Sequence, residues 1–384
     1  MDLQNHSWLL VLAVLLAGGL ALFWTLDILH PSGGPALEAG PLSGAGTSVP
    51  SGLSSNSSAA LSYKASHFPR MPAWSSYEGV INGPKGDSLS SDDLKGHVAL
   101  VDFWTYSCIN CIRTLPYIES WQQRYGPQGF LVVEFHSPEF DFEKNRANVQ
   151  AAVQRFNLST ITVLDGEHRI WDAFGNNYWP HVYLIDADGF VRYDHVGEGG
   201  YDETEKEIRA LLAEQNASSP MPSVSSPALS PIDSVDFSQV GTPELYFGGE
   251  SRRAPLGDSP SVVVPGSPAS YLVPASLSIN TIYLNGTWAD DGQDLRLVSS
   301  DGDILLTYRA KAVHLVADAM SGTSSAQVFL DSAPYSGPEA DSSGSISIGP
   351  SRLYTMVLTP GYETHTVRIH VTGAGMRAYS FTFG

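Results

Sequence analysis

The sequence is poor in two kinds of residue, cysteine and basic residues. Its 384 residues include two cysteines, Cys108 and Cys111, so a zinc site built from four cysteines is excluded. Lys and Arg number 21 against 40 Asp and Glu, which gives a net charge of −19. A protein that binds nucleic acid usually presents a basic surface to the phosphates, and this composition argues against that class of partner.

Charged residues are also missing from one long stretch near the N-terminus. Residues 8–26 are 19 consecutive uncharged positions, which as a helix span about 28 Å, the thickness of a bilayer core. A cleaved signal peptide is the alternative, but residues 1–7 contain no Lys or Arg. The sequence therefore predicts a membrane anchor within residues 1–30, formed by a single transmembrane helix.

Two further stretches contain few residues that could form a core. Residues 31–65 are rich in Gly, Ser, Pro and Ala, and residues 215–240 are rich in Ser and Pro. Such compositions are typical of linkers. They predict two globular parts, at residues 66–214 and 241–384, joined to each other and to the anchor by flexible segments. The length of the chain also suggests two domains.

The two cysteines stand three positions apart where a strand is expected to meet a helix. Residues 98–104 form an apolar run typical of a buried strand, and apolar positions then recur at helical spacing. A thiol at a helix N-terminus is expected to have a lowered pKa, which favours Cys108 as the nucleophile. Cys111, one turn on, could attack a mixed disulfide formed at Cys108. A structural disulfide and a partial metal site are the alternatives.

The cysteine segment FWTYSCINC resembles the active site of thioredoxins, and more closely that of the membrane-tethered TlpA/ResA-type reductases. Asp102, six residues before Cys108, occupies the place of the buried carboxylate in that fold. Pro116 matches the proline within the active-site helix. Trp179 and Pro180 match the loop whose cis-proline faces the cysteines. The segments SPEFDFEKN, YWPHVYLID and GEGGYDETE are most similar to the extracytoplasmic region of DipZ-type proteins.

The resemblance implies an activity and a set of site residues. It implies a thiol–disulfide oxidoreductase that reduces protein or small-molecule disulfides, with no cofactor beyond a redox-active Cys108–Cys111 disulfide. Asp102 is expected to relay a proton to or from Cys111. Pro180, Trp104 and Trp179 are expected to contact substrate.

The resemblance also implies a location and a source of electrons. The soluble domains are expected outside the cytoplasm, at the periplasm or cell surface. Because residues 8–26 are the single candidate span, the electrons are expected to come from a separate membrane donor of the CcdA/DsbD type.

The sequence departs from the family pattern at two places. Thr114 stands where ResA-like proteins carry a glutamate, and Ser107 stands where a tryptophan usually precedes the first cysteine. The departure at Thr114 favours the thioredoxin-style acid, Asp102, over a helix glutamate. Because Ser107 replaces that tryptophan, this edge of the site lacks the aromatic ring on which a substrate would stack.

Residues 66–214 show strands alternating with helices, which predicts an α/β fold. Strands are expected at 98–104, 130–135, 161–164, 182–185 and 190–196, and helices at 142–156 and 202–212. The last two strands are expected to pair across a hairpin at Asp188 and Gly189. With the resemblance, this pattern predicts a thioredoxin-like fold.

Residues 241–384 show short alternating runs separated by Gly, Asn and Asp, which predict an all-β domain. The resemblance implies a jelly roll similar to carbohydrate-binding modules, so carbohydrate is a possible ligand. Trp288, Tyr271, Tyr283 and Tyr335 could form a platform for a sugar. Aromatic residues in strands more often belong to the core.

Three rival functions are left open. A thiol peroxidase of the same fold would place a proline where Val101 stands. A copper-delivery protein would need a wider cysteine spacing and a distal histidine. A surface-binding protein would act through its β domain, and the cysteines would then be dispensable.

Overall fold

The computed structural model describes residues 57–216, 220–229, 234–257 and 264–384, which all belong to one compact unit. The predicted anchor at 1–30 and most of the first predicted linker lie outside these residues. Within the described ranges, no helix is both long and apolar enough to cross a membrane.

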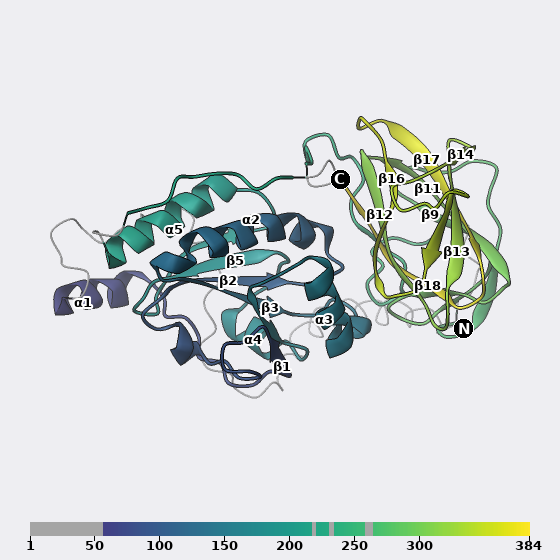
Figure 1. Ribbon diagram of the computed structural model, residues 1–384. Helices are drawn as coiled ribbons and strands as arrows, with labels where there is room; N and C mark the ends of the chain where they lie inside the picture. Colours follow the sequence, from purple (N-terminus) through teal and green to yellow (C-terminus); the bar gives the residue numbers. More distant parts are fainter. Residues whose placement is uncertain (1–56, 217–219, 230–233, 258–263) are drawn as a thin grey trace, which may run out of the picture. The chain divides into compact units, whose positions relative to one another are not determined.

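The first half of the chain forms a six-stranded mixed sheet (Figure 1). Its strands in spatial order are β1 (Gly79–Ile81), β4 (Ile161–Leu164), β3 (Phe130–His136), β2 (Val98–Trp104), β5 (His181–Ile185) and β6 (Val191–Val196). The pairs β2–β3 and β3–β4 are parallel, and the other pairs are antiparallel. The predicted α/β class is confirmed.

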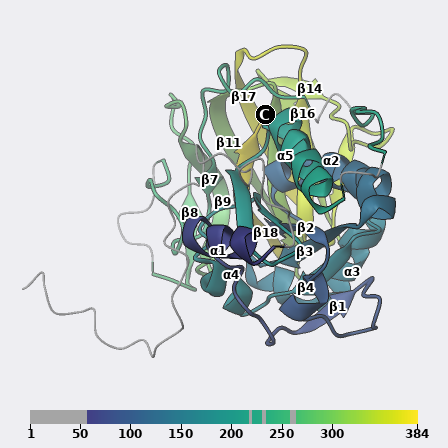
Figure 2. The same cartoon turned by 90° about the vertical axis from the view of Figure 1, so that its left-hand side faces the viewer.

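Five α-helices accompany this sheet: α1 (Ser58–His67), α2 (Ile109–Tyr125), α3 (Arg146–Arg155), α4 (Arg169–Phe174) and α5 (Tyr201–Gln215). Short 3-10 turns lie at η1 (Ser91–Leu94), η2 (Gly126–Gln128) and η3 (Asp141–Lys144). Helices α2 and α5 lie side by side on one face, as Figures 1 and 2 both show. Apolar residues of α4 pack against the opposite face.

Strand β2 lies inside the sheet, and every one of its seven residues is buried. Side chains alternate between the two faces of a strand. Leu100 packs with Trp121 of α2 and Ile208 of α5, whereas Val101 packs with Ile170 of α4. The same alternation directs Asp102 to the face covered by α2.

Helix α1 forms where the sequence predicts a linker. The side chain of Ser57 accepts a hydrogen bond from the backbone N–H of Ala60 and so caps the helix. Lys64 is buried and pairs with Asp186, Asp188 and Glu214. This helix could not be predicted from the composition of residues 31–65, because the residues that anchor it lie far along the chain.

Two other boundaries differ from the prediction. The helix expected from residue 142 begins at Arg146, because the Asn145 side chain caps it by accepting from the N–H of Ala147. In the second predicted linker, Gln215 belongs to α5, and the Pro222 carbonyl accepts a hydrogen bond from Arg209 at 2.6 Å. Part of this segment therefore contacts the preceding helix.

The second half of the chain forms a twelve-stranded antiparallel sheet. Its strands are β7 (Leu245–Tyr246), β8 (Pro268–Tyr271), β9 (Ile282–Asp290), β10 (Leu295–Leu297), β11 (Asp301–Arg309), β12 (Ala312–Ala319), β13 (Ser324–Leu330), β14 (Ala333–Tyr335), β15 (Ser345–Ile348), β16 (Arg352–Leu358), β17 (Thr364–Thr372) and β18 (Met376–Phe383). The predicted all-β class is confirmed, while the jelly-roll connectivity stays a prediction.

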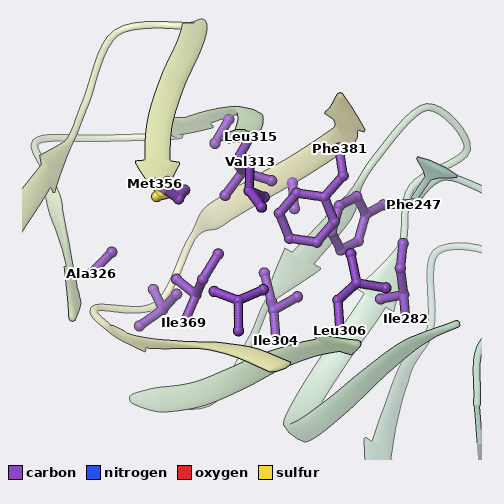
Figure 3. Packing of buried hydrophobic residues seen from close by; sticks show 14 of the residues in the cluster. Phe247, Ile282, Ile304, Leu306, Val313, Leu315, Ala326, Met356, Ile369 and Phe381 are labelled. Carbon is purple, nitrogen blue, oxygen red and sulfur yellow. The ribbon is translucent and has the colours of Figure 1, made fainter. Parts of the chain in front are cut away.

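This sheet curls, and β9 passes through the bend. The first half of β9 pairs with β11 and its second half pairs with β10. Gly286 lies between the two halves with a φ of +96°, where a Cβ atom would come within 2.9 Å of the Asp301 carbonyl. The curl encloses a core to which Ile304, Leu306 and Phe381 contribute (Figure 3).

The aromatic residues proposed as a sugar platform do not form one. Trp288, Tyr271 and Tyr283 are buried, at 0%, 2% and 6% exposure. The Trp288 indole N–H donates to the Asn285 carbonyl at 2.9 Å. Trp288 and Tyr271 pack in the core inside the curled sheet, whereas Tyr283 lies on the other face, against Gly257. Tyr335 is half-buried, with its hydroxyl bonded to the backbone of Leu358. The expectation that these four residues form a platform is therefore corrected.

Candidate functional site

The two cysteines lie where β2 passes into α2. Cys108 is the N-cap residue of α2, and its Sγ accepts a hydrogen bond from the backbone N–H of Cys111 at 3.2 Å. Cys108 is partly exposed, whereas Cys111 is buried, and both are free thiols in this structure. The predicted junction is therefore present, with one sulfur accessible and the other behind it. Pro116 lies within α2, as the resemblance implies.

The electrostatics of Cys108 differ from the sequence-based expectation. Burial raises the pKa of the Cys108 thiol, and the hydrogen bonds from Cys111 offset this only in part. The charges of Glu139 and Glu244 raise it further. The expected net lowering of the Cys108 pKa by the helix N-terminus is therefore wrong, because desolvation outweighs the nearby amide groups.

Cys111 lies in a more apolar environment than Cys108. It packs in a cluster with Trp104, Leu115 and Val149. Burial raises the pKa of the Cys111 thiol well above its ordinary value, and the neighbouring Cys108 and Asp102 raise it further. A thiol of this kind needs a base close by if it is to become a nucleophile.

Asp102 lies deep in the sheet. It is 0% exposed, and neither carboxyl oxygen has a hydrogen-bond partner. Burial raises the pKa of Asp102 to about 8. A carboxyl group in this setting holds a proton at neutral pH and can exchange it near the working range of a thiol.

A cleft of about 430 Å³ opens in front of Cys108. Its lining combines the cysteine loop and the Trp179 loop with the segment before and within β7 and the end of β18. The lining residues are Cys108, Ile109, Asn110, Glu139, Asn177, Tyr178, Trp179, Phe237, Val240, Thr242, Pro243, Glu244, Tyr246, Arg253, Thr382 and Phe383. Aromatic and polar side chains both reach this space, as is usual for a binding cleft.

The three residues expected to contact substrate are placed differently from one another. Trp179 lines the cleft, and its indole N–H donates to the Ser137 carbonyl at 3.0 Å. The Trp179–Pro180 peptide bond is cis, and Pro180 is buried, with its carbonyl accepting from the N–H of Gly197. Trp104 is 0% exposed and packs against Cys111. Contact of Trp104 with substrate is therefore corrected, because its position in β2 directs it into the core.

The loop after β3 contains two glutamates whose placement the sequence did not reveal. From the sequence, Glu139 could lie near the site or on a loop surface. It is partly buried in the cleft and accepts a hydrogen bond from the Tyr246 hydroxyl at 2.5 Å. Glu143 is fully buried and accepts from the Ser107 hydroxyl at 2.6 Å and from two backbone N–H groups. Glu143 thus ties this loop to the turn before Cys108.

Metal ligands do not gather in the described part of the chain. No group of three or more His, Cys, Asp or Glu side chains there could hold an ion. His136, close to the site, is fully buried, and burial lowers its pKa to about 3, so this ring is neutral. It stacks on Tyr106 with ring centroids 5.5 Å apart.

Two family models match the chain. Residues 70–212 match the Redoxin family, and residues 242–384 match the family described as the thioredoxin-like C-terminal domain. These two ranges correspond to the six-stranded and the twelve-stranded sheets.

Named relatives extend these matches. Protein DipZ of Mycobacterium bovis and of Mycobacterium tuberculosis is 34% identical over 309 residues, which cover 80% of this chain and 41% of DipZ. Thiol-disulfide oxidoreductase YkuV of Bacillus subtilis is 26% identical over 38% of this chain and 95% of its own. Thiol-disulfide oxidoreductase ResA of Halalkalibacterium halodurans is 28% identical over 35% of this chain and 72% of its own. The chain thus spans less than half the length of the DipZ proteins.

Proposed function

Because the chain is a thioredoxin-like protein of the TlpA/ResA type, we propose that it is a thiol–disulfide oxidoreductase in which Cys108 and Cys111 form the redox pair and reduce protein disulfides. The observation that carries this proposal is the arrangement of the two sulfurs. One is accessible from a cleft and the other is buried directly behind it, joined by the hydrogen bond between Cys111 N–H and Cys108 Sγ.

The reaction follows from this arrangement. The Cys108 thiolate attacks one sulfur of the substrate disulfide, and the other substrate sulfur leaves as a thiolate that takes a proton from water. Cys111 then loses its proton and attacks Cys108 Sγ, which forms the Cys108–Cys111 disulfide and releases the second substrate thiolate. Two electrons pass from the protein dithiol to the substrate. The protein disulfide must afterwards be reduced by an external dithiol.

Asp102 is proposed as the proton relay for Cys111. Its carboxyl group is buried and unpartnered, and its charge is among the causes that raise the Cys111 pKa. A carboxylate close to a buried thiol can accept the thiol proton at the moment of attack. This role is a proposal about the second step, and it leaves the first attack by Cys108 unaffected.

The cleft is proposed to receive the substrate. Trp179 presents an aromatic face there, and the backbone at Pro180 would align an extended segment beside Cys108. Contact with Pro180 itself requires an approach along the loop backbone, because its ring is buried. A cleft of this size accommodates a short stretch of chain around a cystine more readily than a large rigid surface.

The location and the electron supply are also proposals. The uncharged residues 8–26 support a membrane anchor, with the soluble domains outside the cytoplasm. The similarity to part of DipZ and to ResA supports a donor in the membrane, of the CcdA/DsbD type, that reduces the pair after each turnover. No additional cofactor is needed for the exchange itself.

The test is an assay of the full chain in membrane fractions, with insulin as substrate and dithiothreitol as reductant. Wild type should accelerate insulin reduction, and Cys108→Ser should reduce the rate to that of dithiothreitol alone. Cys111→Ser is the matched variant: it should retain the first attack and accumulate a covalent complex that reductant releases. Full activity in Cys108→Ser, or activity found only in the soluble fraction, would contradict the proposal.

A further inference from the structure

A second buried carboxyl group lies beside Asp102. Strands β2 and β3 are parallel neighbours, and their register places Asp102 opposite Glu134. Residues in register on adjacent strands direct their side chains to the same face of a sheet. Glu134 therefore shares the α2 face with Asp102.

Both groups are buried without a countercharge. Glu134, like Asp102, is 0% exposed. Its Oε1 accepts a hydrogen bond from the Thr160 hydroxyl at 2.9 Å, while its Oε2 and both oxygens of Asp102 have no partner. In the described part of the chain, neither carboxyl group forms an ion pair with Lys or Arg.

Among the described residues, no Lys or Arg acts on either carboxyl group. The titratable groups that act on the pair are Glu119 and Cys111, both from α2. On the far side of Glu134, its register partner on β4 is Thr162, whose hydroxyl also lacks a partner. Two like charges this close in a water-free interior cannot both form at ordinary pH, so the two sites must titrate as a pair.

We propose that Glu134 is a positioning residue that works with Asp102 as one proton-holding pair behind Cys111. Before the second attack, the pair carries one proton and one negative charge. It takes the proton of the Cys111 thiol, so the pair becomes neutral and Cys111 becomes the thiolate that attacks Cys108 Sγ. The proton returns to the thiol when the protein disulfide is reduced again. This inference rests on the proposed exchange reaction, and it deepens the role assigned there to Asp102.

The pair has a consequence that a single relay residue would not have. If Asp102 is replaced by asparagine, Glu134 is freed from a neighbouring charge and can ionise in its place. Burial and the charge of Asp102 both raise the pKa of Glu134 well above its ordinary value, so removing Asp102 should lower it. Either carboxyl group alone should then support part of the proton transfer.

The experiment compares D102N, E134Q and the D102N/E134Q double variant in the reduced full chain. Infrared difference spectra between about pH 6 and about pH 9 report buried carboxyl groups that lose a proton. Burial also raises the pKa values of Glu139 and Asp294, to about 8 and about 7, so the double variant supplies the background signal. Wild type and both single variants should each show one titrating carboxyl group above that background. The rate of the second step should fall by about 3-fold or less in each single variant and by about 100-fold in the double variant.

Two further variants control for structural damage. T162V removes a buried hydroxyl from the neighbouring strand without touching a carboxyl group, and should leave both readouts unchanged. D102N/E134D should restore a titrating carboxyl group that D102N/E134Q lacks. The inference is overturned if D102N alone removes the infrared signal and the rate as completely as the double variant does.

The infrared readout also separates this inference from the proposed function. It does not require an active Cys108, so C108S should keep the wild-type spectrum while losing exchange. If wild type shows the carboxyl signal but no exchange activity, the proposed function fails and the pairing stands. If exchange is normal but wild type shows no titrating carboxyl group beyond those of the double variant, the pairing fails.

Discussion

Two pairs of carboxyl groups on or beside the same six-stranded sheet have opposite surroundings. At one edge, Asp186 and Glu214 each contact both Lys64 and Arg192, at distances of 2.7–3.0 Å. In the centre, Asp102 and Glu134 have no cation beside them. The first pair gains charge-assisted hydrogen bonds that offset desolvation, whereas the second lacks such partners and is proposed above to share a proton. The edge pair therefore holds α1 and α5 to the sheet, and the central pair is available for chemistry.

Glu143 has surroundings intermediate between those of the two pairs, because it has hydrogen-bond donors but no cation among the described residues. No cation pairs with it in the described part of the chain, but the Ser107 hydroxyl and the backbone N–H groups of Glu139 and Phe140 all donate to it. Burial raises its pKa, and these hydrogen bonds act in the opposite direction. The contrast among the three sites indicates that partners, rather than burial alone, separate structural acids from reactive ones.

The largest expected effect is on stability at the edge pair. Arg192→Met keeps most of the side-chain volume but removes a fully buried cation, which leaves Asp186 and Glu214 with Lys64 alone. We expect a loss of about 3–5 kcal/mol in the free energy of unfolding, measured by urea denaturation. Activity per folded molecule should not change.

The matched control for this variant is Arg169→Met, which breaks the exposed pair with Glu78. Exposed pairs contribute little, so its loss should stay below about 1 kcal/mol. If both variants lost equally little stability, the edge pair would not be the structural anchor described above.

The next effect concerns the pH dependence of stability at the central pair. Burial raises the pKa of Asp102 to about 8 in the folded chain, against about 4 in an unfolded chain. The folded state therefore binds an extra proton between these values, so this stability is complete below about pH 4 and is lost as pH rises through about 8. Asp102→Asn removes the contribution of Asp102 to that loss.

Urea denaturation at about pH 5 and about pH 8 measures the difference. We expect the decrease in the free energy of unfolding between these two conditions to be smaller in D102N than in wild type by about 2 kcal/mol or more. The exposed Asp172→Asn serves as the control and should follow wild type. Equal decreases in D102N and wild type would show that Asp102 is not buried as a neutral acid.

The smallest effect concerns Glu143. Ser107→Ala removes one of the hydrogen bonds to Glu143, at 2.6 Å, and should cost about 1–2 kcal/mol by thermal or urea denaturation. Ser159→Ala is the matched control, because this exposed serine also donates to a glutamate, Glu119, at 2.7 Å. It should cost less, since water can replace an exposed donor. A larger loss in Ser159→Ala would reverse the order proposed here.

Much of the central architecture could be predicted because its signals are local. The strand at Val98–Trp104 is continuous and apolar except for Asp102, and it begins and ends where the structure has it. The helix after Cys108 follows from apolar spacing. The same reasoning could have singled out Glu134, a lone acid in the apolar run Phe130–His136. Its pairing with Asp102 could not be predicted, because strand register is set by the whole sheet.

Other features gave no usable signal. Helix α1 has the composition of a linker, and its Lys64 contacts tie it to residues far along the chain. Trp104 could equally have faced a substrate or the core, since both positions suit a tryptophan at the end of a strand. The lowered pKa expected for Cys108 is wrong because segments far along the chain bury it and bring Glu139 and Glu244 close.

By itself, the sequence determined that two sulfurs stand one turn apart at the start of a helix, with an acid in the strand before them. It also determined that an α/β half is followed by an all-β half. The tertiary structure alone decided which buried acids have cations beside them and which have none. The reason is physical: local pattern sets strands and helices, whereas the charge state of a buried group depends on neighbours that only folding brings together.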